Sequence, residues 1–233
     1  RYSVIYHQGE KQSVMHESIL PEFVILDADL IDSVPEYHKK AAYLDAMGHC
    51  IESLWSVHLT RGSRPLSKRG IRMLLDAYEA YFSGDQDIAQ SVLEASNYAG
   101  QAIHITQTAA AHAFSYKLTS MYGIAHGHAV AICLPHIWRY IIDHAEECIR
   151  PKSLEISFKS MCLLFGADDI EGALDNYCKL LDRLDMPVPR MKSDADIDIL
   201  SGAVNATRLS NSLVPIHEED IRQIYTNIMT SKD

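Results

Sequence analysis

The spacing of apolar residues changes once along this chain, at Ser33. Before it, residues 2–6 and 23–26 are β-rich runs, with a turn at 8–11 between the first run and the next. Two or three strands cannot bury both faces by themselves, so we interpret residues 1–32 as the strand remnant of a larger α/β domain. From Ser33 onward the spacing is helical, and Ser33-Val34-Pro35-Glu36 fits a capping box that opens the first helix.

The remainder of the chain, residues 33–233, is predicted to be one all-helical domain, so the fold class is mainly α. Glycines and a Met-Pro-Val-Pro stretch separate the expected helices. The helices are expected at 33–57, 64–82, 85–107, 109–120, 127–148, 153–165, 169–184, 193–207 and 217–230.

Composition excludes several classes of protein. The net charge of −10 argues against binding to nucleic acid or to an anionic membrane. There is no apolar run of transmembrane length, no secretory signal and no Gly-rich phosphate loop. The five cysteines form no Cys-x-x-Cys pair and are interpreted as reduced thiols of a cytoplasmic protein.

Candidate metal ligands stand out in the helical part. Asp45 and His49 are four residues apart, so both side chains lie on one helix face and can reach a single ion. His112 and His126 would complete a set that suits Fe(II), Zn or Mn. Each signal also has an ordinary interpretation: an i,i+4 contact for the pair, a hydrogen-bonded core histidine for the others. His104, His128 and His136 compete as ligands, although the spacing of His128 turns it away from the face of His126.

Two segments carry a resemblance to a known family. Residues 44–53 resemble the Asp-Ala-x-x-His-x-x-Glu motif of the iron-containing (group III) alcohol dehydrogenases, and residues 123–131 with 134–136 resemble a second signature of that family. The resemblance implies the helical metal-binding domain of the dehydroquinate synthase-like fold, in a fragment that lacks most of the dinucleotide domain. It implies Fe(II), with Zn as the second choice, NAD or NADP, and a small alcohol or aldehyde substrate. The residues that it implies are Asp45, His49, His112 and His126 for the metal, and Lys11 and Leu30 for the cofactor.

The chain departs from the family at one position near the substrate. Some members carry a histidine four residues after the third ligand, where this chain has Tyr116, which makes Tyr116 the candidate catalytic residue. Segments 111–120 and 205–211 look closest to phosphonoacetaldehyde reductases. Two alternatives stay open: a non-redox enzyme of the dehydroquinate synthase type, which uses Glu where this chain has Asp45, and an inactive helical binding module. A homodimer is one candidate assembly, and the fragment alone is expected to be inactive.

Overall fold

The N-terminal part of the chain forms a single hairpin. A computed structural model describes residues 2–7, 10–31, 33–204 and 206–231. Strand β1 (Tyr2–His7) pairs antiparallel with β2 (Glu10–Met15), in a register that places Tyr2 opposite Met15 and His7 opposite Glu10. The strand expected at 2–6 is therefore present. Of the turn expected at 8–11, residues 8–9 lie outside the described residues, and Glu10 and Lys11 already belong to β2.

The second predicted strand, 23–26, is wrong. These residues have no regular secondary structure and join no sheet within the described part of the chain, and Phe23 and Ile25 are almost fully exposed. A β-rich run needs a neighbouring strand to supply its backbone hydrogen bonds, and none lies beside this one.

The capping box predicted at Ser33 is also wrong. Helix α1 (Glu36–Leu54) has Pro35 at its N-cap, and Ser33 Oγ instead donates to the Leu30 carbonyl at 3.5 Å. A proline restricts the preceding residue to extended conformations, so the helix cannot include Val34 and starts after Pro35.

The rest of the chain is helical, as predicted, with shifted boundaries. The expected helix 193–207 is divided between α8 and α9, that at 85–107 starts only at Ala89, and that at 127–148 ends at Asp143. The helices after α1 are α2 (Ser63–Phe82), α3 (Ala89–Thr106), α4 (Ala110–Tyr122), α5 (His126–Asp143), α6 (Pro151–Phe165), α7 (Ile170–Leu184), α8 (Ala195–Ser201), α9 (Ala206–Leu209) and α10 (Glu218–Thr230). Single 3₁₀ turns occur at 17–19, 28–31, 86–88 and 145–147.

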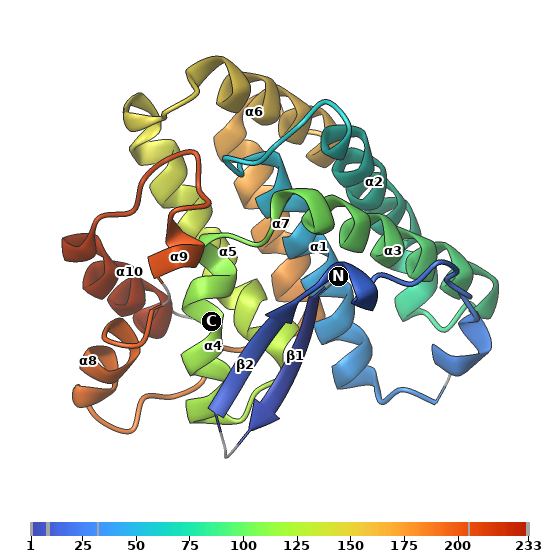
Figure 1. Cartoon of the computed structure of the whole chain (residues 1–233), viewed down its shortest axis with the longest axis horizontal. Helices are drawn as coiled ribbons and strands as arrows, with labels where there is room; N and C mark the ends of the chain where they lie inside the picture. The colour runs from blue at the N-terminus through green and yellow to red at the C-terminus, as the bar shows by residue number, and fades with distance from the viewer. Residues whose placement is uncertain (1, 8–9, 32, 205, 232–233) are drawn as a thin grey trace.

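Helix α1 lies at the centre of the bundle, packed against α2, α3 and α5, while α4 packs on α5 (Figure 1). The C-terminal end of α1 is fixed by aromatic packing. The ring centroids of Trp55 and of Trp138 in α5 lie 5.6 Å apart, and those of Trp138 and of Tyr177 in α7 lie 6.0 Å apart. Burying side chains of this size stabilises the fold by about 1.5–3 kcal/mol each. The central helix is therefore a rigid platform for the polar residues that it carries.

Helices α1 and α5 approach each other at a glycine. A Cβ atom built on Gly127 would lie 2.0 Å from the Ala41 carbonyl oxygen and 2.7 Å from Asp45 Cβ, so no side chain fits there. Gly48 of α1 allows a similar approach, because a Cβ atom built on it would lie 2.9 Å from Cγ1 of Val130 in α5. The crossing brings the start of α5 directly against the middle of α1.

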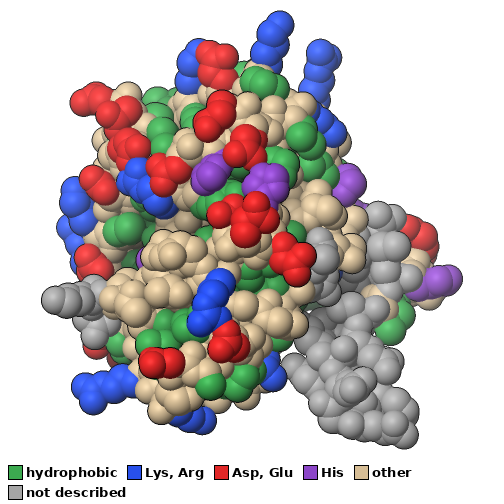
Figure 2. All heavy atoms as spheres, turned by 90° about the vertical axis from the view of Figure 1, so that its left-hand side faces the viewer, with side chains coloured by type: hydrophobic (Ala, Val, Ile, Leu, Met, Phe, Trp, Pro, Cys, Tyr) green, Lys and Arg blue, Asp and Glu red, His purple; other side chains and the backbone are tan. Residues whose placement is uncertain are grey.

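The side of the molecule that carries α8 and α10 shows many carboxylates, with Lys, Arg and His side chains among them (Figure 2). Glu147 accepts hydrogen bonds from His144 Nδ1 at 3.1 Å and His217 Nε2 at 2.7 Å, at the start of α10. No helix in the described part of the chain has the length and apolar character that crossing a membrane requires.

Candidate metal centre

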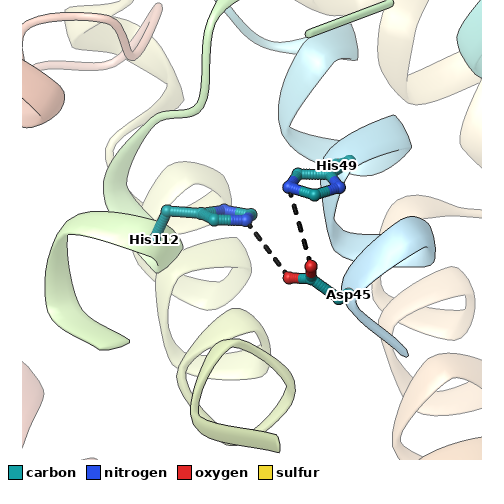
Figure 3. Close-up of side chains that lie close together, drawn as sticks. All are labelled: Asp45, His49 and His112. Carbon is teal, nitrogen blue, oxygen red and sulfur yellow. Dashed lines mark ion pairs between the residues drawn. The ribbon is translucent and has the colours of Figure 1, made fainter. Parts of the chain in front are cut away.

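Asp45 and His49 project from one face of α1, one turn apart, as Figure 3 shows. The distance from Asp45 Oδ2 to His49 Nε2 is 3.9 Å. Both side chains are partly exposed, in contrast to the fully buried Leu44 and Met47 beside them. The spacing on the helix thus delivers two ligand-type atoms to the same side of the central helix.

His112 enters the site from the first turn of α4. Its Nε2 atom lies 3.5 Å from Asp45 Oδ1, and its ring stacks on that of His49 at 4.6 Å with an interplanar angle of 14°. Small residues around it, Ala109 to Ala113, let α4 pack closely. Asp45, His49 and His112 offer ligand atoms that all lie within 4.8 Å of one another.

Glu52 holds His112 in place. This fully buried carboxylate accepts hydrogen bonds from the backbone N–H of Ala109 at 2.9 Å, from that of Ala111 at 2.5 Å and from His112 Nδ1 at 2.6 Å. Because Nδ1 donates to Glu52, Nε2 is the ring nitrogen that faces Asp45. Sequence reasoning assigned Glu52 no role, although it lies seven residues after Asp45 on the same helix face.

His126, the fourth predicted ligand, is the first residue of α5. Its Nε2 atom lies 3.9 Å from Asp45 Oδ1, and its ring meets that of His112 at 5.3 Å. Ser115 Oγ lies 3.4 Å from His126 Nδ1. The close approach of α5 to α1 at Gly127 places the adjacent His126 beside Asp45.

Tyr116 forms a wall of the site beside His126. The two rings are parallel, with an interplanar angle of 8° and 5.6 Å between their centroids. Burial raises the pKa of Tyr116, while the positive charge of Arg208 and a hydrogen bond with the Thr108 side chain act in the opposite direction. Its phenol is therefore protonated at neutral pH and can donate a hydrogen bond.

The charges of the site are strongly coupled. Burial alone would raise the pKa of Asp45, but the neighbouring imidazoles of His49 and His112 outweigh it and hold that pKa below its usual range. Burial lowers the pKa of His49 to about 4, against the pull of Asp45. Burial also acts to lower the pKa of His112, but the carboxylates of Glu52 and Asp45 raise it to about 9. The site thus combines a carboxylate, a neutral imidazole and an imidazole that keeps a proton.

Two buried atoms in the centre have no hydrogen-bond partner: Asp45 Oδ1 and His112 Nε2. Buried polar atoms are normally paired, and a carboxylate oxygen facing an imidazole nitrogen is a ligand set for a divalent transition metal. Asp45, His49, His112 and His126 therefore fit such an ion. Their assignment as its ligands stays a prediction.

The competing histidines have other roles. Both ring nitrogens of His128 are engaged, since Nδ1 lies 3.1 Å from the Tyr37 hydroxyl and Nε2 lies 3.0 Å from the Pro187 carbonyl oxygen. This agrees with the expectation that His128 turns away from the site. His136 lines a pocket with Cys178, and burial lowers its pKa to about 4.

The two predicted cofactor residues belong to the N-terminal segment. Leu30 lies in the 3₁₀ turn at 28–31 and is exposed, and Lys11 lies in β2, with its side chain outside the described residues. Their assignment to the cofactor stays a prediction.

Comparison with known proteins gives a consistent result. A family model described as "Fe-containing alcohol dehydrogenase family, C-terminal" matches residues 40–229. Lactaldehyde reductase of Escherichia coli (strain K12) is 30% identical over 135 residues, which cover 56% of this chain and 34% of the relative. Phosphonoacetaldehyde reductase of Streptomyces viridochromogenes is 28% identical over 147 residues, covering 61% of this chain and 37% of the relative. The matched region thus spans little more than a third of these two proteins.

A solved structure has the same fold. Sulfoacetaldehyde reductase from Bifidobacterium kashiwanohense, solved in complex with NAD⁺, superposes with a TM-score of 0.87 over 99% of this chain and 61% of its own, at 20% sequence identity. The predicted fold, the helical C-terminal domain of the iron-containing alcohol dehydrogenases, is confirmed. Whether residues 1–32 are a remnant of a dinucleotide domain stays a prediction.

Proposed function

The chain belongs to the Fe-containing alcohol dehydrogenase family, and we propose on this basis that it supplies the metal-binding part of an enzyme that interconverts a small primary alcohol and its aldehyde with NAD or NADP. The observation that supports this most directly is the pair of unpartnered buried atoms, Asp45 Oδ1 and His112 Nε2, with His49 and His126 around them. In a chain of this family, Fe(II) is the expected ion and Zn the second choice.

When bound, the metal supplies Lewis acidity toward the substrate oxygen and the nicotinamide supplies the hydride. This chain's own residues hold and shape the site. Asp45 contributes the one anionic ligand, and Glu52 fixes the tautomer of His112 through the bond at 2.6 Å. His49 stays neutral at physiological pH because burial lowers its pKa to about 4, so its lone pair is available. Tyr116 stacks on His126, and its protonated phenol can donate a hydrogen bond to the substrate.

For the substrate, we propose a short aldehyde of the phosphonoacetaldehyde type. The support is the similarity to the phosphonoacetaldehyde reductase of Streptomyces viridochromogenes and the segments 111–120 and 205–211, which resemble that subgroup. The two segments are neighbours in the fold, since α9, which lies in the second, packs against α4, which lies in the first.

Metal analysis tests the site without the rest of the enzyme. The chain, purified anaerobically and loaded with Fe(II) or Zn, should hold about one ion per chain. His49→Ala and His126→Ala should each weaken binding strongly, whereas His128→Ala should retain the ion because both of its nitrogens are already engaged. Wild-type metal affinity in both His49→Ala and His126→Ala would mean that the ligand set is wrong.

Activity is tested in a second step. The chain alone should not oxidise NAD(P)H with phosphonoacetaldehyde or with C2–C4 aldehydes, since hydride transfer needs the nicotinamide within about 3–3.5 Å of the substrate carbon. A longer chain that carries an upstream dinucleotide-binding domain should do so once metal-loaded. Inactivity of that enzyme toward all these aldehydes would refute the proposed reaction.

A further inference from the structure

The metal centre depends on how the start of α5 is held against α1. His126, the first residue of α5, is the most exposed of the four predicted ligands: 37% of its side chain is accessible, against 2% for His112. Helix α5 also begins without a side-chain cap, since its N-cap residue is Ala125. The direction of His126 therefore depends on contacts that other helices make with this turn.

One face of α1 supplies three such contacts, each one turn after the last. Tyr37, Ala41 and Asp45 are spaced by four residues and so lie in a row along this helix. The Tyr37 hydroxyl accepts a hydrogen bond from the Ala125 backbone N–H at 2.8 Å. Ala41 makes the close contact with the glycine of α5 described above, and Asp45 Oδ1 faces His126 Nε2 at 3.9 Å. The bond of Tyr37 thus fixes the backbone directly before the ligand.

The Tyr37 hydroxyl is in turn held by His128. It lies 3.1 Å from His128 Nδ1, and the two rings meet edge to face with their centroids 5.8 Å apart. His128 Nε2 lies 3.0 Å from the Pro187 carbonyl oxygen. Because a carbonyl oxygen can only accept, Nε2 carries the hydrogen and Nδ1 accepts from the Tyr37 hydroxyl, whose oxygen accepts from Ala125. Each donor in this series has an acceptor, so the hydroxyl has one defined orientation.

We propose that Tyr37 is a positioning residue of the metal centre: its hydroxyl anchors the backbone of Ala125 and so directs the next residue, His126, toward the other ligands. This role rests on the proposed function, because it presupposes that His126 is a metal ligand. A backbone that is already fixed lowers the entropic cost of bringing a ligand to the ion. Tyr37 acts on the centre through His126 and takes no part in the transfer of hydride or proton.

Chelator competition for Zn, performed on this chain, measures the effect. Tyr37→Phe keeps the ring against His128 and removes only the hydroxyl, so the affinity should fall by about 3- to 10-fold, as expected for losing one hydrogen bond. The absorption spectrum of the Co(II)-loaded chain should change as well, because His126 meets the ion at a different angle. Tyr140→Phe is the matched control. Its hydroxyl donates to Asp220 at 2.8 Å, roughly 20 Å along α5 from His126, so its loss should leave affinity and spectrum unchanged.

A double-mutant cycle separates positioning from a general loss of stability. If Tyr37 acts through His126, Tyr37→Phe should have little further effect on Zn affinity in the His126→Ala background, where three ligands remain. His128→Ala should cost less than Tyr37→Phe, because the bond to Ala125 stays. An equal loss in both backgrounds, or wild-type affinity and spectrum in Tyr37→Phe itself, would overturn the role of Tyr37. These measurements follow metal binding alone, so they decide this role whether or not the longer enzyme reduces aldehydes.

Discussion

Replacing Glu52 by Gln tests how the metal centre is held together without removing any predicted ligand. The change keeps the shape of the side chain but removes its charge. In the structure Glu52 accepts three hydrogen bonds, from Ala109, Ala111 and His112, so both of its oxygens serve only as acceptors. The amide of Gln has one acceptor oxygen, and its NH₂ group would face a backbone N–H.

The expected effects follow from these bonds. At least one buried N–H loses its acceptor, and the bond to His112 Nδ1, at 2.6 Å, loses its ionic character. We expect the free energy of unfolding of the metal-free chain to fall by about 2–4 kcal/mol. The affinity for Fe(II) or Zn should fall by about 10- to 100-fold, which is the typical cost of removing a partner that orients a ligating histidine.

Chelator competition measures the metal affinity, and urea unfolding measures the stability of the same sample. Glu79→Gln is the control: Glu79 is exposed and pairs with Arg183, away from the metal centre, so its loss should cost less than about 1 kcal/mol and leave the metal affinity unchanged. A Glu52→Gln variant that binds metal within twofold of wild type would refute the idea that Glu52 fixes the His112 tautomer.

The remaining predictions concern packing, pH and metal removal. Gly127→Ala should lower the free energy of unfolding by about 2–3 kcal/mol, because its Cβ would collide with the Ala41 carbonyl oxygen, whereas Gly100→Ala, with open space around it, should be neutral or stabilising; urea unfolding distinguishes them. Burial lowers the pKa of His136 to about 4, so the folded state binds fewer protons than the unfolded state and stability falls as pH drops from 6.5 toward 4; His136→Gln should remove about 2 kcal/mol of that fall at pH 5. Removing the metal by dialysis against a chelator should lower Tm. From a free metal concentration of 100 times Kd, the free energy of unfolding should fall by about 2.7 kcal/mol, and His112→Ala should abolish this shift.

The helical architecture could be predicted from the sequence because most helices show a clear helical spacing of apolar residues and are separated by glycine or proline residues. The ends of the helices were harder to predict. Pro35 excludes Ser33 from α1, and α8 and α9 are two helices in a segment where the spacing of apolar residues suggested one. The run at 23–26 has strand-forming residues, but a strand depends on a neighbour that local sequence does not reveal.

Only part of the metal centre could be predicted from the sequence. The four-residue spacing of Asp45 and His49 is local and could be read directly, whereas the distance between α1 and α4 that brings His112 to Asp45 is a property of packing. Glu52 was missed as a participant for the same reason. It bonds to residues 57 to 60 positions further along the chain.

The contact at Gly127 also bears on how such a chain can change over evolutionary time. There α1 and α5 meet through main-chain atoms, and the limiting neighbour is a carbonyl oxygen that every residue type possesses at position 41. Substitutions elsewhere in the core can therefore accumulate while the separation of the two helices stays constant. The separation of the helices that carry Asp45 and His126 therefore depends most on Gly127, where any side chain larger than hydrogen would push them apart, and less strictly on Gly48, where the limiting neighbour is the side chain of Val130.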